Sequence, residues 1–221
     1  MKQVTLYLYD IYMIIKPKII TNDEIQQGTE EWKQLRLGKA TASKFKRIIT
    51  RTGKRSTSYE KYALELAFEK FAARIPDSFS TQAMERGIAL ESIARQEYSK
   101  NTLTEVTEVA FFDCGSYGFS PDGLIDDDGL IEVKAMNIEK HAECFITKEV
   151  PDEHYAQCQG ALMVSQRKWI DFVSYNSDLR QPLDLVIIRL FPDIEFINNL
   201  SKYVQDTINK RDEFIKLIEN K

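Results

Sequence analysis

Residues 120–135 read SPDGLIDDDGLIEVKA. Asp128-Gly129 is a strong turn signal between two short apolar runs, so this stretch predicts two antiparallel strands joined by a tight hairpin. Because side chains alternate between the two faces of a strand, Glu132 and Lys134 should share one face and point toward Asp122 across the hairpin. The stretch therefore predicts a strand pair that gathers two carboxylates and one ammonium group.

This grouping is typical of a metal-dependent phosphodiesterase site. Mg²⁺ favours carboxylate, carbonyl and water oxygens, and two ions roughly 4 Å apart can hold the attacking and leaving oxygens of a phosphodiester. Asp122 and Glu132 would supply carboxylates and Val133 its main-chain carbonyl. Lys134 would lower the pKa of the attacking water or stabilise the transition state. The alternative for Lys134 is a surface ion pair with Glu132, which contributes under about 1 kcal/mol.

Two more polar side chains lie on helical patterns. Glu91 falls on the inward stripe of its predicted helix, and charged groups are seldom buried unless they are paired or bound to metal. It is therefore either a metal ligand or the ion-pair partner of Arg86 or Arg95. Gln157 lies among apolar residues of a later helix, where it is either a core hydrogen-bonding group or a catalytic one.

A basic tract interrupts an acidic chain. The formal net charge is −4, yet residues 32–59 contain nine basic residues and no acidic one. Such segregation is typical of a phosphate-binding surface, although a solvated charged face would have the same composition. Residues 53–58 (GKRSTS) read as a mobile loop that orders on a partner. The basic residues of the tract are Lys33, Arg36, Lys39, Lys44, Lys46, Arg47, Arg51, Lys54 and Arg55.

The composition also excludes several classes of protein. The two histidines, His141 and His154, form no zinc-hydrolase or Cys–His motif, and there is no Walker loop. The three cysteines are an odd number without Cys-x-x-Cys spacing, so a reducing cytoplasm is expected rather than a disulfide framework. Residues 1–15 are apolar but carry Asp10 in a run too short for a membrane span.

Local patterns predict one α/β domain in which helices flank a small mixed sheet. Residues 1–25 are expected to be an N-terminal extension of uncertain structure, and 26–221 the domain itself. Helices are expected over 29–37, 41–49, 59–74, 82–100, 139–147, 151–164 and 193–218. Strands are expected over 105–113, 123–125, 130–135, 169–175 and 183–191.

Five separated blocks of the chain resemble the YqaJ-like viral recombinases, which are the phage lambda exonuclease group of the Asp-Glu-x-Lys nuclease superfamily. The blocks follow the family's order within residues 27–191. They are residues 32–38 with 41–43, then 86–91, 120–124, 130–134 and 156–159. The resemblance implies a restriction-endonuclease-like core over 26–221. It also implies a Mg²⁺-dependent exonuclease that degrades one strand of linear double-stranded DNA from 5′ to 3′.

The resemblance further implies roles for individual residues. One set would hold two Mg²⁺ ions, which Mn²⁺ could replace: Glu91, Asp122, Glu132 and the carbonyl of Val133. The residues acting at the catalytic centre would be Asp122, Glu132, Lys134 and Gln157. A pocket for the 5′-phosphate would be formed by Arg36, Ser43 and Ser120. The expected DNA contacts are Lys44, Arg51, Lys54, Arg55 and Lys140.

Proteins of this group often form ring-shaped homotrimers and pass the exposed 3′ strand to a single-strand annealing protein, so both partners are expected here. Two alternatives stay open. A structure-specific or site-specific endonuclease of the same superfamily would have the same metal site. A non-catalytic DNA-binding recombination protein could keep the fold, but an acidic cluster beside phosphates would not help it. The intact set of Asp122, Glu132 and Lys134 argues against that alternative.

Overall fold

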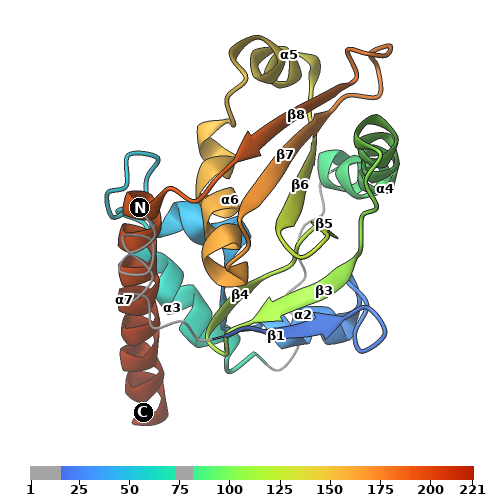
Figure 1. Cartoon of the computed structure of the whole chain (residues 1–221). Helices are drawn as coiled ribbons and strands as arrows, with labels where there is room; N and C mark the ends of the chain where they lie inside the picture. The colour runs from blue at the N-terminus through green and yellow to red at the C-terminus, as the bar shows by residue number, and fades with distance from the viewer. Residues whose placement is uncertain (1–15, 73–81) are drawn as a thin grey trace, which may run out of the picture.

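In the computed structural model of the protein, residues 16–72 and 82–221 are described (Figure 1). The prediction for residues 1–15 lies outside these described residues, as do residues 73–74. The helix expected over 59–74 ends at Glu69, within the described part of the chain. No helix within the described ranges is long and apolar enough to cross a membrane.

The strands form two four-stranded sheets rather than one (Figure 1). The first sheet has the order β1-β3-β4-β2: Lys18–Thr21, Val109–Asp113, Tyr117–Phe119 and Ala40–Thr41. The second has the order β5-β6-β7-β8: Gly123–Ile125, Gly129–Ala135, Trp169–Tyr175 and Leu185–Leu190. Each sheet is mixed, because β2 pairs with β4 and β6 with β7 in parallel while the other pairs are antiparallel. The expected α/β class is confirmed, with two small mixed sheets in place of the single one expected.

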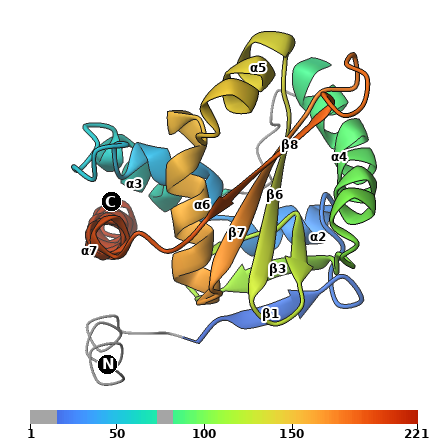
Figure 2. The same ribbon diagram turned by 45° about the horizontal axis from the view of Figure 1, so that its top comes forward.

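Helices flank the second sheet on both faces, α4 on one and α6 on the other (Figure 2). The helices are α2 Glu30–Arg36, the 3₁₀ helix η1 Ala42–Arg47, α3 Tyr59–Glu69, α4 Gln82–Thr102, α5 Ile138–Thr147, α6 Asp152–Ser165 and α7 Ile194–Glu219. Strand β6 alternates accordingly, since Ile131 and Val133 pack with α4 residues and Leu130 packs in the core that contains α6. Glu132 and Lys134 therefore face α6.

Several observed elements differ from the predicted ones. Residues 41–49 form a short strand and a six-residue 3₁₀ helix instead of one α-helix. The strand expected over 105–113 begins at Val109, although Thr107 forms an isolated bridge with Leu124. Strands β1 and β4 were not predicted, because each has fewer residues than a periodic pattern needs.

The segment expected as a mobile loop over 53–58 is instead the end of a small closed turn. Ile49 bridges Arg55, and the amide of Ser56 donates to the carbonyl of Ile48. The guanidinium of Arg55 lies 4.8 Å from the ring centres of both Tyr59 and Tyr203, and it forms an ion pair with Asp206 of α7. The small and polar residues of this segment suggested an unattached loop, whereas long-range contacts with α7 hold it.

The β5–β6 hairpin forms with the predicted pairing. Gly123 lies opposite Ile131, and Ile125 lies opposite Gly129. Arg167 closes the turn, because its Nη1 donates to the carbonyls of Asp126 and Gly129 at 2.7 Å each. Gly129 cannot carry a side chain, since an added Cβ would lie 2.2 Å from Trp169 Cζ2. The turn and its packing thus fix the strand that carries Glu132.

Candidate active site

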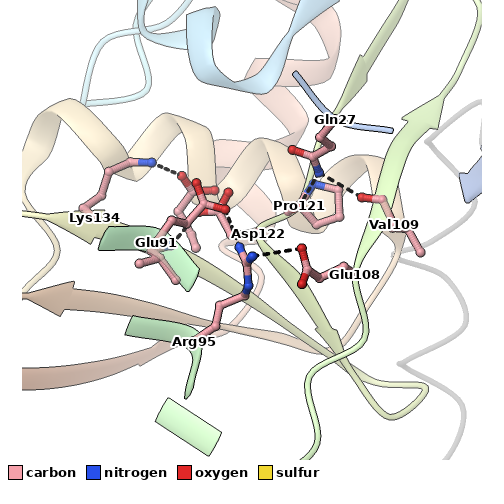
Figure 3. A network of polar contacts seen from close by, with 10 residues as sticks. Gln27, Glu91, Arg95, Glu108, Val109, Pro121, Asp122 and Lys134 are labelled. Carbon is pink, nitrogen blue, oxygen red and sulfur yellow. Dashed lines mark hydrogen bonds and ion pairs between the residues drawn. The ribbon is translucent and has the colours of Figure 1, made fainter. Parts of the chain in front are cut away.

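The hairpin brings the predicted acidic residues together at the start of β5. Asp122 directly precedes β5, and its Oδ2 accepts a 2.6 Å hydrogen bond from the main-chain N–H of Val133 on β6. Glu91 extends from α4 toward Asp122 (Figure 3), close enough that each charge affects the other. Since the N–H and C=O of one strand residue point to the same edge, the carbonyl of Val133 also faces Asp122.

Glu132 is the centre of the hydrogen bonds on the α6 side. Its side chain is 2% exposed, and its Oε1 accepts hydrogen bonds from Lys134 Nζ and from Gln157 Nε2, the latter at 2.5 Å. Gln157 reaches Glu132 from α6, which follows β6 in the sequence after helix α5. The hydrogen-bond partner of Gln157 is thus a carboxylate of the acidic cluster, while its catalytic role stays a prediction.

The electrostatics of the cluster show an excess of acid. Burial, followed by the charge of Asp122, raises the pKa of Glu132, and the same two causes raise the pKa of Glu91. Burial lowers the pKa of Lys134, but the carboxylates of Glu132 and Asp122 outweigh it and raise that pKa above its ordinary value. Three acids therefore share one nearby lysine and Arg95, and a bound cation would relieve their repulsion.

The donor types fit Mg²⁺, which binds hard carboxylate and carbonyl oxygens. Within the described ranges, however, no three His, Cys, Asp or Glu side chains lie close enough to hold one ion as they stand. Each carboxylate is instead turned to a donor of the protein: Glu91 to Arg95, Asp122 to the Val133 amide, and Glu132 to Lys134 and Gln157. Rotation of these side chains would be needed for them to share an ion.

Glu91 shows one of its two predicted roles. It forms an i,i+4 ion pair with Arg95, and Arg95 Nη2 also donates to Glu108 at 2.9 Å (Figure 3). Arg86, the other candidate partner, pairs with Asp178 instead. The ion pair is thus observed, while the role of Glu91 as a metal ligand stays a prediction.

One pocket of about 430 Å³ joins the acidic cluster to the predicted phosphate site. Its lining includes all three residues expected to bind a 5′-phosphate and three of those expected at the catalytic centre or the metal: Arg36, Ser43, Ser120, Glu91, Asp122 and Gln157. These residues come from α2, η1, α4, α6 and the segment between β4 and β5. The cavity therefore joins the predicted phosphate site to part of the predicted catalytic centre, whereas Glu132, Val133 and Lys134 are not among the residues that line it.

Arg36 has the features of an anion-binding group. Its guanidinium lies over the Trp32 ring, 3.8 Å from the centroid, and its Nε is buried with no hydrogen-bond partner in the described part of the chain. Burial lowers the pKa of Arg36 to about 10, still far above neutrality. A charged, partly unsatisfied donor in a pocket is suited to a phosphate oxygen.

Trp32 connects the parts of this phosphate site and was not among the predicted site residues. Its Nε1 donates to Ser120 Oγ at 3.0 Å and to the carbonyl of Ala110 at 3.2 Å, while its ring supports Arg36. Its only sequence signal was its place in the first family-like block. Ser43 is exposed on η1, with its Oγ 3.4 Å from that of Thr41.

The five predicted DNA contacts divide into two groups. Arg51, Arg55 and Lys140 form ion pairs with Asp152, Asp206 and Glu153, respectively. Lys44 and Lys54 are exposed and form no ion pair with the described residues. DNA phosphates would have to displace carboxylates to bind Arg51, Arg55 or Lys140. Lys44 and Lys54 can bind phosphates without such competition.

Comparison with known proteins agrees with this geometry. The family model of the YqaJ-like viral recombinase domain matches residues 31–168. An alkaline exonuclease (LHK-Exo) from Laribacter hongkongensis is 32% identical, with a TM-score of 0.79 over 87% of this chain and 97% of that chain. The structure of that enzyme in complex with dAMP gives a TM-score of 0.78 over the same shares of the two chains.

A phage-related exonuclease from Haemophilus somnus 129PT shares the fold at 16% identity, with a TM-score of 0.65 over 81% of this chain and 96% of that chain. We find no match among curated protein sequences. The family model spans more than half of the chain and includes the hairpin, α4 and α6, on which the acidic cluster is built. This protein belongs to the YqaJ-like viral recombinase family.

Proposed function

We propose that this protein is a Mg²⁺-dependent exonuclease that degrades one strand of linear double-stranded DNA from 5′ to 3′ and leaves 3′ single-stranded overhangs for recombination. The observation that carries the proposal is the single pocket in which Arg36 and the acidic cluster meet. A 5′-terminal phosphate bound at Arg36 would leave the adjoining diester near Asp122 and Glu132. The relation to an alkaline exonuclease supports the same reaction.

Each residue of the cluster has a part in this hydrolysis. Glu91, Asp122, Glu132 and the Val133 carbonyl would hold Mg²⁺, which supplies a Lewis acid and an activated water when bound. Gln157 orients Glu132 through its amide. Lys134, which pairs with Glu132, would place a positive charge beside the phosphate oxygens, where it lowers the pKa of the attacking water or stabilises the transition state.

The phosphate site gives the reaction its polarity. A terminal phosphate carries more charge than an internal diester, so the guanidinium of Arg36 favours an end. Ser43 and Ser120 add hydroxyl groups in the same pocket. Exposed Lys44 and Lys54 bind the duplex outside the pocket, joined by Arg51, Arg55 and Lys140 when phosphates displace their acidic partners.

The wider assignments rest on the family. We propose that the protein acts as a homotrimer in the cytoplasm of a bacterial host and delivers its product to a single-strand annealing protein. Size-exclusion chromatography with light scattering measures the oligomeric state, and co-purification tests the association with the annealing protein.

The decisive experiment uses three DNA substrates: a linear duplex labelled at one 5′ end, the same duplex labelled at the 3′ end, and a closed circle. Degradation of only the linear forms in Mg²⁺, with loss of the 5′ label first, is expected. Asp122→Ala should abolish it, whereas Asp127→Ala, which removes an exposed acid from the turn of the same hairpin, should not. Cleavage of the circle would favour the endonuclease alternative, and DNA binding without cleavage would favour the non-catalytic one.

A further inference from the structure

The side chain of Gln27 joins the two sheets beside the acidic cluster. Its Nε2 donates to the main-chain carbonyls of Val109 and Pro121, at 2.9 Å each (Figure 3). Val109 begins β3 of the first sheet, and Pro121 directly precedes Asp122 at the entry to the second. One amide group therefore links both sheets at the residue before an acid of the cluster.

The main chain could not close this junction unaided. Residues 120–122 run between β4 and β5 and belong to neither strand, and Pro121 has no N–H to donate. Val109 and Pro121 are both buried, so their carbonyls need hydrogen-bond donors. The NH₂ group of a glutamine carries two donors, one for each carbonyl.

The position of Gln27 is itself fixed from the N-terminal side. It follows strand β1, which pairs with β3 along Ile19, Ile20 and Thr21. Gly28 then turns the chain away with a φ of +84°, a left-handed conformation that favours glycine. Gln27 therefore reaches Pro121 from a segment that is anchored to the first sheet.

We infer that Gln27 is a positioning residue for Asp122, an inference that rests on the proposed metal-dependent function. The main chain before Asp122 is held by Gln27, and its carboxylate is held by the amide of Val133. The two contacts together fix where the carboxylate stands relative to Glu132 on β6. Gln27 lines the same pocket but acts through Asp122 rather than on the reacting atoms.

The test measures Mn²⁺ binding by isothermal titration calorimetry, with thermal unfolding of each metal-free variant in parallel. Gln27→Met keeps the side-chain length and removes both donors, so Mn²⁺ affinity should fall by roughly 10-fold or more, as for residues that orient metal ligands. Gln27→Asn keeps the amide but shortens the side chain by one methylene, and should weaken binding in the same direction. Gln27→Asn is the test variant if Gln27→Met does not fold. Gln26→Ala, a change at the exposed neighbour, should leave Mn²⁺ affinity unchanged.

Activity gives a second readout. If Gln27 positions Asp122, high Mn²⁺ concentrations should restore much of the lost nuclease rate in Gln27→Met or Gln27→Asn. Lowered thermal stability with native Mn²⁺ affinity in a folded variant would show a purely structural role and overturn the inference. Failure of the native protein to bind Mn²⁺ would overturn the proposed metal site and the inference together. Native Mn²⁺ affinity in the Gln27 variants would overturn the inference alone, so the two failures can be distinguished.

Discussion

The main-chain N–H of Val133 donates a 2.6 Å hydrogen bond to Oδ2 of Asp122. This bond ties the acid that precedes β5 to β6, the strand that carries Glu132 and Lys134. Oδ1 of Asp122 has no hydrogen bond to the described residues and is free for another ligand. The hairpin thus orients the carboxylate of Asp122 and also brings it close to the strand that carries Glu132.

The first prediction concerns Glu132→Gln. The substitution keeps the size of this buried side chain but removes the charge that Lys134 pairs with and that a metal would require. Single-turnover digestion of linear duplex in Mg²⁺ should slow by roughly 100- to 1000-fold or more. DNA binding in Ca²⁺ should stay within about twofold of native, because phosphate contacts dominate it. A rate near that of the Asp127→Ala control would remove Glu132 from the catalytic centre.

A second prediction concerns DNA ends. Arg36→Met should erase the preference for 5′-phosphorylated over 5′-hydroxyl duplex, because the buried guanidinium beside Trp32 is lost. The matched control is Arg47→Met, which removes another guanidinium stacked on a ring, that of Tyr62, and paired with Glu65. Initial rates on the two kinds of end measure the preference. Equal slowing on both by Arg36→Met would contradict a phosphate pocket.

Salt dependence provides a third prediction. Lys44→Ala and Lys54→Ala should each reduce the slope of log affinity against log salt concentration by about 0.9, the value for one released phosphate contact. Fluorescence anisotropy with a short duplex at several NaCl concentrations gives the slope. Lys210→Ala, which removes a lysine paired with Glu213 on α7, should leave it unchanged. If all three variants have the native slope, Lys44 and Lys54 do not contact DNA phosphates.

Stability below neutral pH yields a fourth prediction. Burial, followed by the charge of Lys134, lowers the pKa of His154 to about 4, from an ordinary value of 6.5. The unfolded chain therefore binds a proton first, and folding stability is lost as pH falls from about 6.5 to 4, by up to about 3 kcal/mol. His154→Phe, which retains a ring against Phe172, should flatten this loss in urea unfolding at pH 7, 6 and 5. An identical pH slope in both proteins would contradict it.

The fifth prediction compares two glycines inside helices. An added Cβ at Gly160 of α6 would lie 2.3 Å from Phe45 Cδ2, whereas at Gly87 of α4 no described residue outside the helix's own backbone and the adjacent residues lies within 4 Å of that position. Gly160→Ala should therefore destabilise the fold by roughly 1–3 kcal/mol through overpacking. Gly87→Ala should stabilise it by up to about 1 kcal/mol, because alanine favours helix. Thermal unfolding measures both, and a stabilised Gly160→Ala would show that Phe45 moves freely.

Local sequence predicted those elements whose determinants lie within a few residues. The Asp128-Gly129 turn gave the hairpin, and the apolar stripe of residues 193–218 gave α7 to within two residues. Thr29 caps α2 as expected by accepting from the Trp32 amide. Turn geometry, capping and side-chain periodicity act between near neighbours, so they can be read from the chain.

By itself, then, the sequence determined the hairpin and the shared face of Glu132 and Lys134. Only the tertiary structure decided that Gln157 binds Glu132, that Arg95 rather than Arg86 pairs with Glu91, and that Gln27 bridges two sheets. The contacts of Gln157 and Gln27 join residues that lie far apart in the sequence. The ion pair of Glu91 depends on which of two nearby arginines the packing of the helix leaves beside it. Local sequence patterns do not predict such partners, because the fold alone decides which polar groups are buried together and must satisfy one another.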